Sequence, residues 1–343
     1  MNASNHIDGF RANAICRGLD DAAVSQLFAL AELFAAPGGT RLVRQGEVSR
    51  GAYLLLHGTC EARVTLPGGG DRPVATFSDG DMFGETALLD QGHCSAAVFA
   101  MSETQGWFID RQAFRALTAG RNAAALAIAR NIALGLATRL GRLNAELLRH
   151  PAAEDREVPD VLPVGDPLAG VERQPAAAFA LRPFLPVLPV FAGFSTADID
   201  MVVAPAQSLQ VARGQWLFVA GQPAESCFLL VRGAVEVCAR NDGRERRLAV
   251  LGPGSLIGYL SVLGSGTHGA SARVREAADL LEFPADAFRR LFAGVSGAEA
   301  RMQHAVQRAM LASLARSNSQ LSRLVTQEAL VEALRARAAQ TAI

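Results

Sequence analysis

Short runs of β-prone residues, separated at regular intervals by glycine-containing turns, occupy most of the first third of the chain. The runs fall at residues 53–56, 62–66, 74–77, 96–99 and 107–109. Branched and aromatic side chains suit a pleated, half-buried sheet, and turns at this spacing join consecutive antiparallel strands. The pattern predicts a small antiparallel β-barrel or jelly roll.

A long helical pattern follows this region. Its apolar residues alternate steps of three and four, the spacing of a coiled-coil seam, and the clearest part of the seam comprises Leu136, Leu140, Leu143 and Leu147. A weaker seam lies in the helical pattern of residues 298–338, where Ser317 fills one slot, and comprises Met310, Leu314, Leu321 and Leu324. We expect the two seams to pair within one chain, or each to pair with its copy in a second chain.

The two halves of the chain repeat one another. Residues 39–61 align without a gap on residues 214–236 at an offset of 175, and residues 77–84 align on residues 251–258 at an offset of 174. The matching positions are turn glycines and apolar residues, which indicates a duplicated domain. Upstream of each copy, Asp20 and Ser195 precede apolar helical patterns and are predicted to be N-caps.

The repeat predicts two tandem domains of one class, mainly β with flanking helices. The first covers residues 1–149 and the second residues 179–343, and each ends in a long helix. Residues 150–178 contain five prolines among scattered acids and alanines, so we predict a semi-rigid linker there.

Composition narrows the classes of function. Half of the 343 residues are hydrophobic, which excludes disorder over most of the chain, and 33 basic residues balance 33 acidic ones. No global charge therefore attracts nucleic acid or an anionic membrane. The five cysteines form no CxxC pair, so we expect neither a metal site nor a disulfide framework. We therefore expect the protein to lie in a reducing compartment. Without a signal peptide or an apolar span in the sequence, we predict a cytoplasmic protein.

One segment of the first domain carries a distinctive motif. Residues 80–89 read Gly-Asp-Met-Phe-Gly-Glu-Thr-Ala-Leu-Leu, and residues 95–98 read Ser-Ala-Ala-Val. This segment resembles the phosphate-binding cassette of the cyclic nucleotide-binding domain family, which includes catabolite-activator-type bacterial regulators and the tandem regulatory subunit of cAMP-dependent protein kinase. The candidate ligand-binding residues are Gly84, Glu85, Thr86, Ala87, Cys94, Ser95 and Ala96.

The resemblance implies a jelly-roll domain that holds a cyclic nucleotide. In the family, amides at the start of a short helix and an arginine before the Ser-Ala pair hold the phosphate, and the Gly-Glu carboxylate binds the ribose. Here Glu85 is kept, but Cys94 fills the arginine slot. A lost charge-assisted contact costs roughly 1.5–3 kcal/mol, so the first site is expected to be weakened.

The second copy departs further from the family pattern. Its degenerate counterpart comprises Gly258, Tyr259, Ala270, Ser271 and Ala272. Tyr259 replaces the glutamate and is expected to crowd the pocket, and Ala270 precedes the Ser-Ala pair where the arginine should be. Arg273 lies an odd number of strand positions further on and is expected to point away from the pocket. We predict that this site binds no cyclic nucleotide.

Simpler interpretations compete with these assignments. Glu85 at a first helical turn would satisfy free amides. Cys94 is expected to be a small buried hydrophobe, with a redox-sensing thiol as the alternative, and His93 to be a solvated loop residue rather than a partial cation. A further cluster around the turn at 241–243, which we expect to be an exposed charged hairpin rather than a nucleic-acid surface, consists of Arg240, Arg244, Arg246 and Arg247.

No catalytic nucleophile, metalloprotease or P-loop motif occurs in the sequence, so we expect a regulatory protein rather than an enzyme, without a cofactor other than a cyclic nucleotide in the first domain. Two hypotheses stay open: a sensor that uses the first domain, and a ligand-free scaffold that assembles through its leucine-rich helices with an unidentified protein partner. A catabolite-activator-type transcription regulator is a third. It is disfavoured because no helix-turn-helix is expected before the sequence ends at Ile343, and we expect no binding of nucleic acid or membrane.

Overall fold

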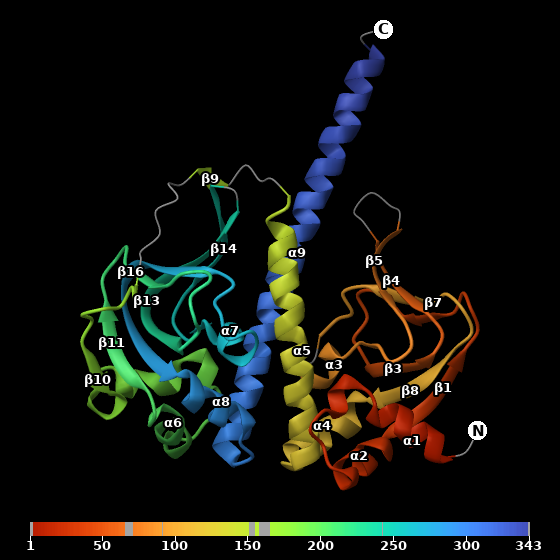
Figure 1. Cartoon of the computed structure of the whole chain (residues 1–343), viewed down its shortest axis with the longest axis horizontal. Helices are drawn as coiled ribbons and strands as arrows, with labels where there is room; N and C mark the ends of the chain where they lie inside the picture. The colour runs from red at the N-terminus through yellow and green to blue at the C-terminus, as the bar shows by residue number, and fades with distance from the viewer. Residues whose placement is uncertain are drawn as a thin grey trace. The chain divides into compact units, whose positions relative to one another are not determined.

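The computed structural model describes residues 3–65, 71–90, 92–150, 155–157, 165–241 and 243–341. The chain divides into two compact units, residues 1–133 and 134–343. The division lies inside one long helix, so the end of that helix belongs to the second unit. Each unit contains one copy of the sequence repeat (Figure 1).

Unit 1 is an antiparallel sandwich with helices before and after it. Its helices are α1 (Ala3–Arg11), α2 (Asp21–Phe28), α3 (Thr86–Leu89), α4 (Arg111–Ala119) and α5 (Ala123–Leu147), with a 3-10 turn at Ala14–Cys16. Its strands are β1 (Ala31–Ala36), β2 (Arg41–Val43), β3 (Gly51–His57), β4 (Cys60–Thr65), β5 (Asp71–Phe77), β6 (Met82–Phe83), β7 (Ala97–Ala100) and β8 (Thr104–Asp110). Among the described residues the sheet orders are β1-β8-β3-β6 and β2-β7-β4-β5.

Aromatic side chains fill the centre of unit 1. The Tyr53 ring lies edge-on to Phe34 at 5.2 Å and stacks on Phe83 at 5.0 Å between ring centroids. Both sheets keep open edges in the described part of the chain, so the predicted jelly-roll-like architecture is correct and a closed barrel is not.

Unit 2 repeats this architecture with longer strands. Its strands are β9 (Arg156–Glu157), β10 (Arg173–Pro175), β11 (Gln207–Val211), β12 (Trp216–Phe218), β13 (Ser226–Asn241), β14 (Arg244–Leu251), β15 (Leu256–Ile257) and β16 (Ser271–Pro284). Its helices are α6 (Thr196–Val203), α7 (Tyr259–Leu263), α8 (Ala285–Ala293) and α9 (Gly297–Thr341), and 3-10 turns lie at Ala176–Ala178, Arg182–Val187 and Pro189–Phe191. Over the described residues the sheet follows the order β10-β11-β16-β13-β14-β9, with β12 paired to β16 and β15 to β13.

Part of the predicted linker is built into unit 2. Leu168 is 2% exposed and belongs to the apolar core, and β10 pairs with β11. Two side-chain amides hold the same segment, because Gln222 Nε2 donates to the Gly165 carbonyl at 2.8 Å and Gln215 Nε2 donates to the Pro167 carbonyl at 3.3 Å. Residues 165–178 are therefore a packed segment of unit 2, whereas residues 151–154 and 158–164 of the predicted linker lie outside the described part of the chain.

Both predicted N-caps are confirmed. Asp20 accepts a hydrogen bond from the Ala23 amide at 2.8 Å. Ser195 forms a capping box with Asp198, in which each side chain bonds the other residue's backbone amide. Hydrogen bonds from Ser195 and then from Arg301 lower the pKa of Asp198 to about 2.

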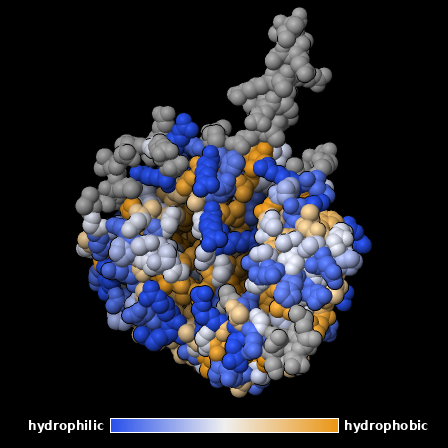
Figure 2. All heavy atoms as spheres, turned by 45° about the vertical axis from the view of Figure 1, so that its right-hand side comes forward, coloured by the Kyte–Doolittle hydropathy of each residue, from blue (hydrophilic) through white to orange (hydrophobic). Residues whose placement is uncertain are grey.

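Helix α5 is long and apolar enough to cross a membrane by length and composition alone, which differs from our expectation that no such span exists. In this structure 56% of its apolar window is buried inside the protein, as in a helix that packs within a core. On the face of the molecule drawn in Figure 2, hydrophilic and hydrophobic residues are mixed, and no single hydrophobic patch dominates. Among the residues whose burial the structure describes, the exposed large hydrophobic ones are Leu33, Val48, Val74, Met101, Phe184, Val187, Met201, Val250 and Val295.

Candidate functional site

The cassette of unit 1 contains a glycine whose backbone conformation and surroundings disfavour any side chain. Gly84 has a φ of 75°, and a Cβ atom there would approach the Gly51 carbonyl oxygen to 2.8 Å. Helix α3 follows at once. Glu85 stands at its N-cap with helical dihedral angles, and its side chain makes no capping hydrogen bond. The interpretation of Glu85 as a helix cap is therefore wrong, and its side chain is half-buried beside the first turn of α3.

Cys94 lies where the chain returns from the cassette to β7. Its amide donates to the Glu47 carbonyl, and its carbonyl accepts from the Gly46 amide, both at 2.8 Å. The side chain is half-buried, not the fully buried hydrophobe that we expected. Burial raises the pKa of the thiol, against an opposing hydrogen bond with Ser49, so the group is neutral at pH 7. A neutral thiol offers no charge to a phosphate and is a poor redox nucleophile.

Residues 46–53 contact both ends of the cassette of unit 1. The Gly51 carbonyl lies against Gly84, and the Gly46 amide donates a hydrogen bond to the Cys94 carbonyl. The same stretch carries Arg50. Burial raises the pKa of Tyr53, and the Arg50 guanidinium opposes that rise, so Arg50 lies within electrostatic reach of the Tyr53 hydroxyl. We did not single out this arginine from the sequence, because it lies outside the cassette motif.

The other candidate residues of unit 1 differ in exposure. Ser95 and the neighbouring His93 are exposed, so His93 is solvated as expected. Thr86 and Ala96 are half-buried, and Ala87 is buried in the first turn of α3. The polar edge of the cassette is thus accessible to solvent.

Backbone hydrogen bonds identify the residue of unit 2 that matches Cys94. In unit 2 the Gly221 amide donates to the His268 carbonyl at 2.8 Å, and the His268 amide donates to the Gln222 carbonyl at 2.9 Å. These two bonds reproduce the pair that Cys94 makes in unit 1. His268, not Ala270, therefore occupies the position that corresponds to Cys94.

Strand register supports this correction. Val43 lies opposite Val98 where β2 pairs with β7, and Phe218 lies opposite Ala272 where β12 pairs with β16. Ala272 of β16 thus corresponds to Val98 of β7 at an offset of 174, the same offset that relates Cys94 to His268. Our sequence assignment was wrong because it matched the two Ser-Ala pairs, which the register places two positions apart.

His268 packs as an uncharged aromatic side chain. It is 4% exposed, and its ring stacks on Phe218 with 3.7 Å between centroids and 7° between planes. Burial lowers the pKa of His268 to about 4, so it is neutral at pH 7. A Cβ atom on Gly258, which has a φ of 78°, would approach both rings to within 3.2 Å. The second cassette therefore also lacks a cation in this slot.

The remaining counterpart residues of unit 2 are buried. Ser271 is 1% exposed and accepts a hydrogen bond from the Ala220 amide at 2.9 Å, and Ala272 lies in the core. Tyr259 is 4% exposed on α7, where burial raises its pKa, and Ser313 and Arg316 of α9 lie near its hydroxyl. Arg273 points away from the core and donates to Glu236 at 3.0 Å, in agreement with strand alternation.

Leucines cover the cassette strand of unit 2. Ala270 packs against an apolar cluster, here called the leucine plug, which comprises Leu147, Leu148, Val237, Ala239, Leu248, Leu321 and Leu324. Three of the predicted seam leucines, one from the end of α5 and two from α9, thus meet in this cluster. Ser317, the polar slot in the second seam, donates to Asn144 Oδ1 at 2.9 Å. Within unit 2 the end of α5 therefore lies beside α9 (Figure 1).

The other predicted seam residues are also removed from solvent to different degrees. Leu136, Leu140, Met310 and Leu314 are buried, and Leu143 is half-buried.

The same sheet position is open in unit 1. The pairing of β4 with β5 shifts register after Ala62, and the pairing of β13 with β14 shifts at the matching place, after Val237. Val74 and Leu248 are the residues that these two bulges accommodate. Val74 is 55% exposed, whereas Leu248 is 8% exposed inside the leucine plug.

One arginine of the predicted exposed hairpin is buried, which corrects that prediction. Arg246 is 7% exposed and donates from Nε and Nη2 to the Asp155 carboxylate, both at 2.7 Å. It also donates to the Leu147 and His150 carbonyls. Arg246 thus satisfies carbonyls at the end of α5, which the charge pattern of the hairpin did not reveal.

Comparisons with known proteins agree with this geometry. The profile of the cyclic nucleotide-binding domain family matches residues 34–121 and 208–294, just over half of the chain. The chain is 33% identical over 94 residues to the cyclic AMP receptor protein of Thermus thermophilus, which covers 27% of this chain and 44% of that protein. It is 35% identical over 104 residues to the cAMP-dependent protein kinase regulatory subunit of Blastocladiella emersonii, covering 30% of this chain and 26% of that protein.

The match therefore spans less than half the length of either curated relative. Among solved structures, the regulatory domain of Toxoplasma gondii PKA with cAMP is 15% identical with a TM-score of 0.33, and the match covers 88% of this chain and 96% of that one. The two profile matches coincide with the two copies of the sandwich. This chain belongs to the cyclic nucleotide-binding domain family and carries two tandem copies of that domain.

Proposed function

We propose that this chain is a non-enzymatic regulatory protein in which unit 1 senses a cyclic nucleotide or a related phosphorylated small molecule, and unit 2 carries a filled cassette that binds none. The contrast between Val74 and Leu248 carries the proposal. At one sheet position, the cassette of unit 1 has an exposed apolar side chain and that of unit 2 has a plugged one.

Unit 1 offers groups for each part of such a ligand. The Glu85 carboxylate, which does not cap α3, is suited to accept hydrogen bonds from ribose hydroxyls. The exposed Ser95 and the first turn of α3 offer donors to a phosphate, and Val74 offers apolar surface to a base. Because Cys94 is neutral, we expect an affinity about ten- to a hundredfold below that of a site with an arginine there.

Unit 2 would have to empty its own site before it could bind. A ligand at the cassette strand would displace Leu147, Leu321 and Leu324 from the leucine plug. Full burial of a leucine side chain is worth about 1.5–3 kcal/mol, which applies to Leu147, and the partly buried Leu321 and Leu324 contribute less. Because His268 is neutral, it would offset none of that loss through a charge-assisted contact with a phosphate. The expected occupancy of unit 2 by a cyclic nucleotide is negligible.

The filled site supplies a route for regulation. Helix α4 follows the sandwich of unit 1 and precedes α5, and the end of α5 is fixed in unit 2 by Leu147 in the plug and by Arg246 on its last carbonyls. Ligand binding that moved α5 would therefore act directly on unit 2. Such coupling needs two states of the helix that the ligand distinguishes.

Hydrogen–deuterium exchange on the full chain tests the proposal. With saturating cyclic AMP, protection should rise in residues 84–98 of unit 1 and stay unchanged in residues 258–274 of unit 2. Glu85→Gln should remove the protection, and Glu103→Gln, which changes an exposed carboxylate outside the cassette, should keep it. Protection confined to residues 258–274 would refute the assignment of the two units.

A ligand-free scaffold is the second candidate, favoured by the neutral side chains, Cys94 and His268, in both arginine slots. In that case the plug would serve only to join α5 to α9. Unchanged exchange in both cassettes with cyclic AMP, cyclic GMP and cyclic dinucleotides would select this candidate over the sensor.

A further inference from the structure

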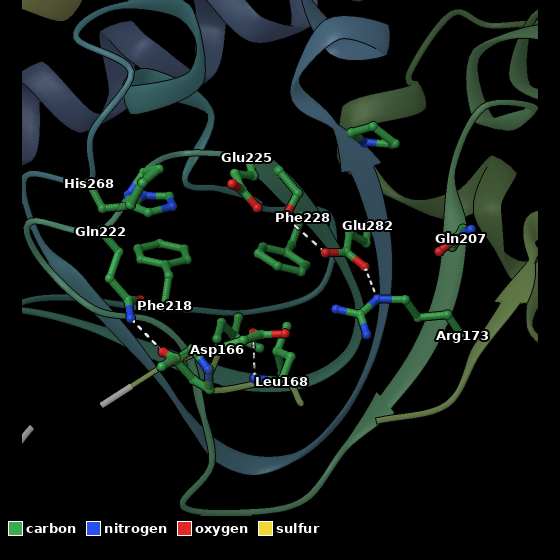
Figure 3. Close-up of a pocket in the computed structure, with 16 residues that line it drawn as sticks. Asp166, Leu168, Arg173, Gln207, Phe218, Gln222, Glu225, Phe228, His268 and Glu282 are labelled. Carbon is green, nitrogen blue, oxygen red and sulfur yellow. Dashed lines mark hydrogen bonds and ion pairs between the residues drawn. The ribbon is translucent and has the colours of Figure 1, made fainter. Parts of the chain in front are cut away.

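Unit 2 contains a pocket that no residue of the leucine plug lines. It has a volume of about 580 Å³ and is walled by residues 165–168, the end of β12, the start of β13 and the end of β16 (Figure 3). The segment 165–168 is held in place by Leu168 in the core and by Gln222 on the Gly165 carbonyl. A pocket of this size is large enough for a small organic molecule.

One wall of the pocket is aromatic. The Phe218 and Phe228 rings lie 6.3 Å apart between centroids with 18° between their planes, and His268 stacks on Phe218. Phe218, His268 and Phe228 are 6%, 4% and 1% exposed, so only a small part of each ring faces the pocket. A narrow aromatic strip favours a small ligand with a flat apolar body, because a ring can meet other rings edge to face with little accessible area.

The rim of the pocket is acidic. Three carboxylates and one guanidinium line it, which leaves a net charge of −2, because His268 is neutral. Arg173 Nε donates to Glu282 at 2.7 Å, and Ser226 Oγ donates to the same carboxylate at 2.9 Å, so this pair is satisfied internally. The uncompensated charges belong to Asp166 and Glu225.

Glu225 is the acid placed to meet a ligand. Its side chain is exposed, and among the described residues no ion pair or hydrogen bond engages its carboxylate. Figure 3 shows this carboxylate between His268 and Phe228, beside the aromatic wall. Asp166, by contrast, already accepts a hydrogen bond from the Leu168 amide at 2.9 Å.

The acidic rim distinguishes this pocket from the matching region of unit 1. The aligned position of Glu225 is Arg50, at an offset of 175, and that of Glu282 is Phe108, at the offset of 174 that holds along β8 and β16. A phosphate would be repelled by the rim of unit 2, and a cation would be attracted to it. The pocket therefore selects a different chemistry from a cyclic nucleotide site.

We propose that this pocket binds a small organic amine, with its flat apolar body against Phe218 and Phe228 and its ammonium group paired with the Glu225 carboxylate. The proposal is independent of the function proposed for unit 1, because it involves no residue of that unit.

Calorimetric titration of the full chain with tryptamine, phenethylamine and indole-3-propionate at neutral pH tests it. Indole-3-propionate keeps the ring of tryptamine and replaces the ammonium group by a carboxylate. Both amines should bind and the acid should not. Glu225→Gln should weaken tryptamine binding about tenfold, the loss of one charge-assisted contact. Glu276→Gln, which removes an exposed carboxylate of β16 that does not line the pocket, should leave it unchanged.

A second measurement fixes the location. The imidazole NMR signals of His268, assigned by their loss in His268→Gln, should shift on addition of tryptamine and not on addition of cyclic AMP. Equal binding of amine and acid, full affinity in Glu225→Gln, unshifted His268 signals, or no heat with either amine at millimolar concentration would each overturn the proposal. None of these outcomes bears on whether cyclic AMP binds unit 1, so the two proposals fail separately.

Discussion

Cys94 and His268 hold the same position in the two copies of the domain, each joined by two backbone hydrogen bonds to a glycine and to the residue after it. Neither side chain carries charge at neutral pH, because burial raises the pKa of Cys94 and lowers that of His268 to about 4. The two cassettes share this defect and differ in what covers them. The proposed roles of the two units therefore differ because the leucine plug covers only the second cassette, and not because of the residue in the arginine slot.

Restoring the cation should strengthen the first site. We expect Cys94→Arg to increase the affinity of the full chain for cyclic AMP by about tenfold or more, because a guanidinium pairs with a phosphate in a bidentate, charge-assisted manner. Isothermal titration measures the change, with Cys94→Ser as the neutral control. An unaltered affinity in a correctly folded Cys94→Arg chain would mean that this position does not face the ligand.

Leu248 in the leucine plug should contribute more to the free energy of unfolding than Val74 at the matching exposed position of unit 1. Leu248→Ala is expected to destabilise unit 2 by about 2–5 kcal/mol, since it leaves a cavity among buried side chains. Val74→Ala, the matched change at an exposed position, should alter stability by about 0.5 kcal/mol or less. Calorimetric unfolding of both variants checks this, and equal losses would argue that Leu248 is not plugged.

Breaking the buried ion pair at the end of α5 should also destabilise unit 2. In the Arg246–Asp155 pair the side chains are 8% and 10% exposed, so Arg246→Ala removes the guanidinium from a buried carboxylate and should cost about 3–5 kcal/mol. Asp155→Asn should recover part of that loss in the double variant. Urea unfolding of the single and double variants measures the coupling, and strictly additive losses would contradict a direct pair.

Alkylation of Cys94 should be slow at neutral pH. The thiolate is the reactive form, and a pKa raised above the ordinary 9.0 reduces its fraction at pH 7.5 relative to a free cysteine. The rate should rise with pH and reach half its maximum above pH 9.0. Ser49→Ala removes a hydrogen bond that lowers this pKa, so it should slow the reaction further. Mass spectrometry after iodoacetamide treatment follows the site, and rapid alkylation at pH 7 would disprove the neutral thiol.

The sequence predicted a duplicated jelly-roll domain because turn glycines and alternating apolar residues depend on local geometry. Asp20 and Ser195 were predictable as N-caps for the same reason, since a cap depends on a few consecutive residues. The equivalence of Cys94 and His268 was not predictable from residue identity. It depends on which amides and carbonyls pair across strands, and two alanine-rich segments align equally well in more than one register.

The side chains that fill the second cassette site could not be predicted from the sequence either. The seam spacing marked Leu147, Leu321 and Leu324 as packing residues, but only the folded chain brings them onto the strand beside Ala270. Arg246 looked like one of several exposed hairpin charges, because its partner Asp155 lies 91 positions away in a proline-rich segment. Long-range pairing of this kind leaves no periodic signal in the chain.

The most direct test of the account is the stoichiometry of cyclic AMP binding to the intact chain by isothermal titration, with Glu85→Gln as the variant in unit 1. We predict one site per chain, lost in Glu85→Gln and kept in Leu248→Ala. Two sites per chain, a single site that survives Glu85→Gln unchanged, or no heat with cyclic AMP, cyclic GMP or cyclic dinucleotides at millimolar concentration would contradict it.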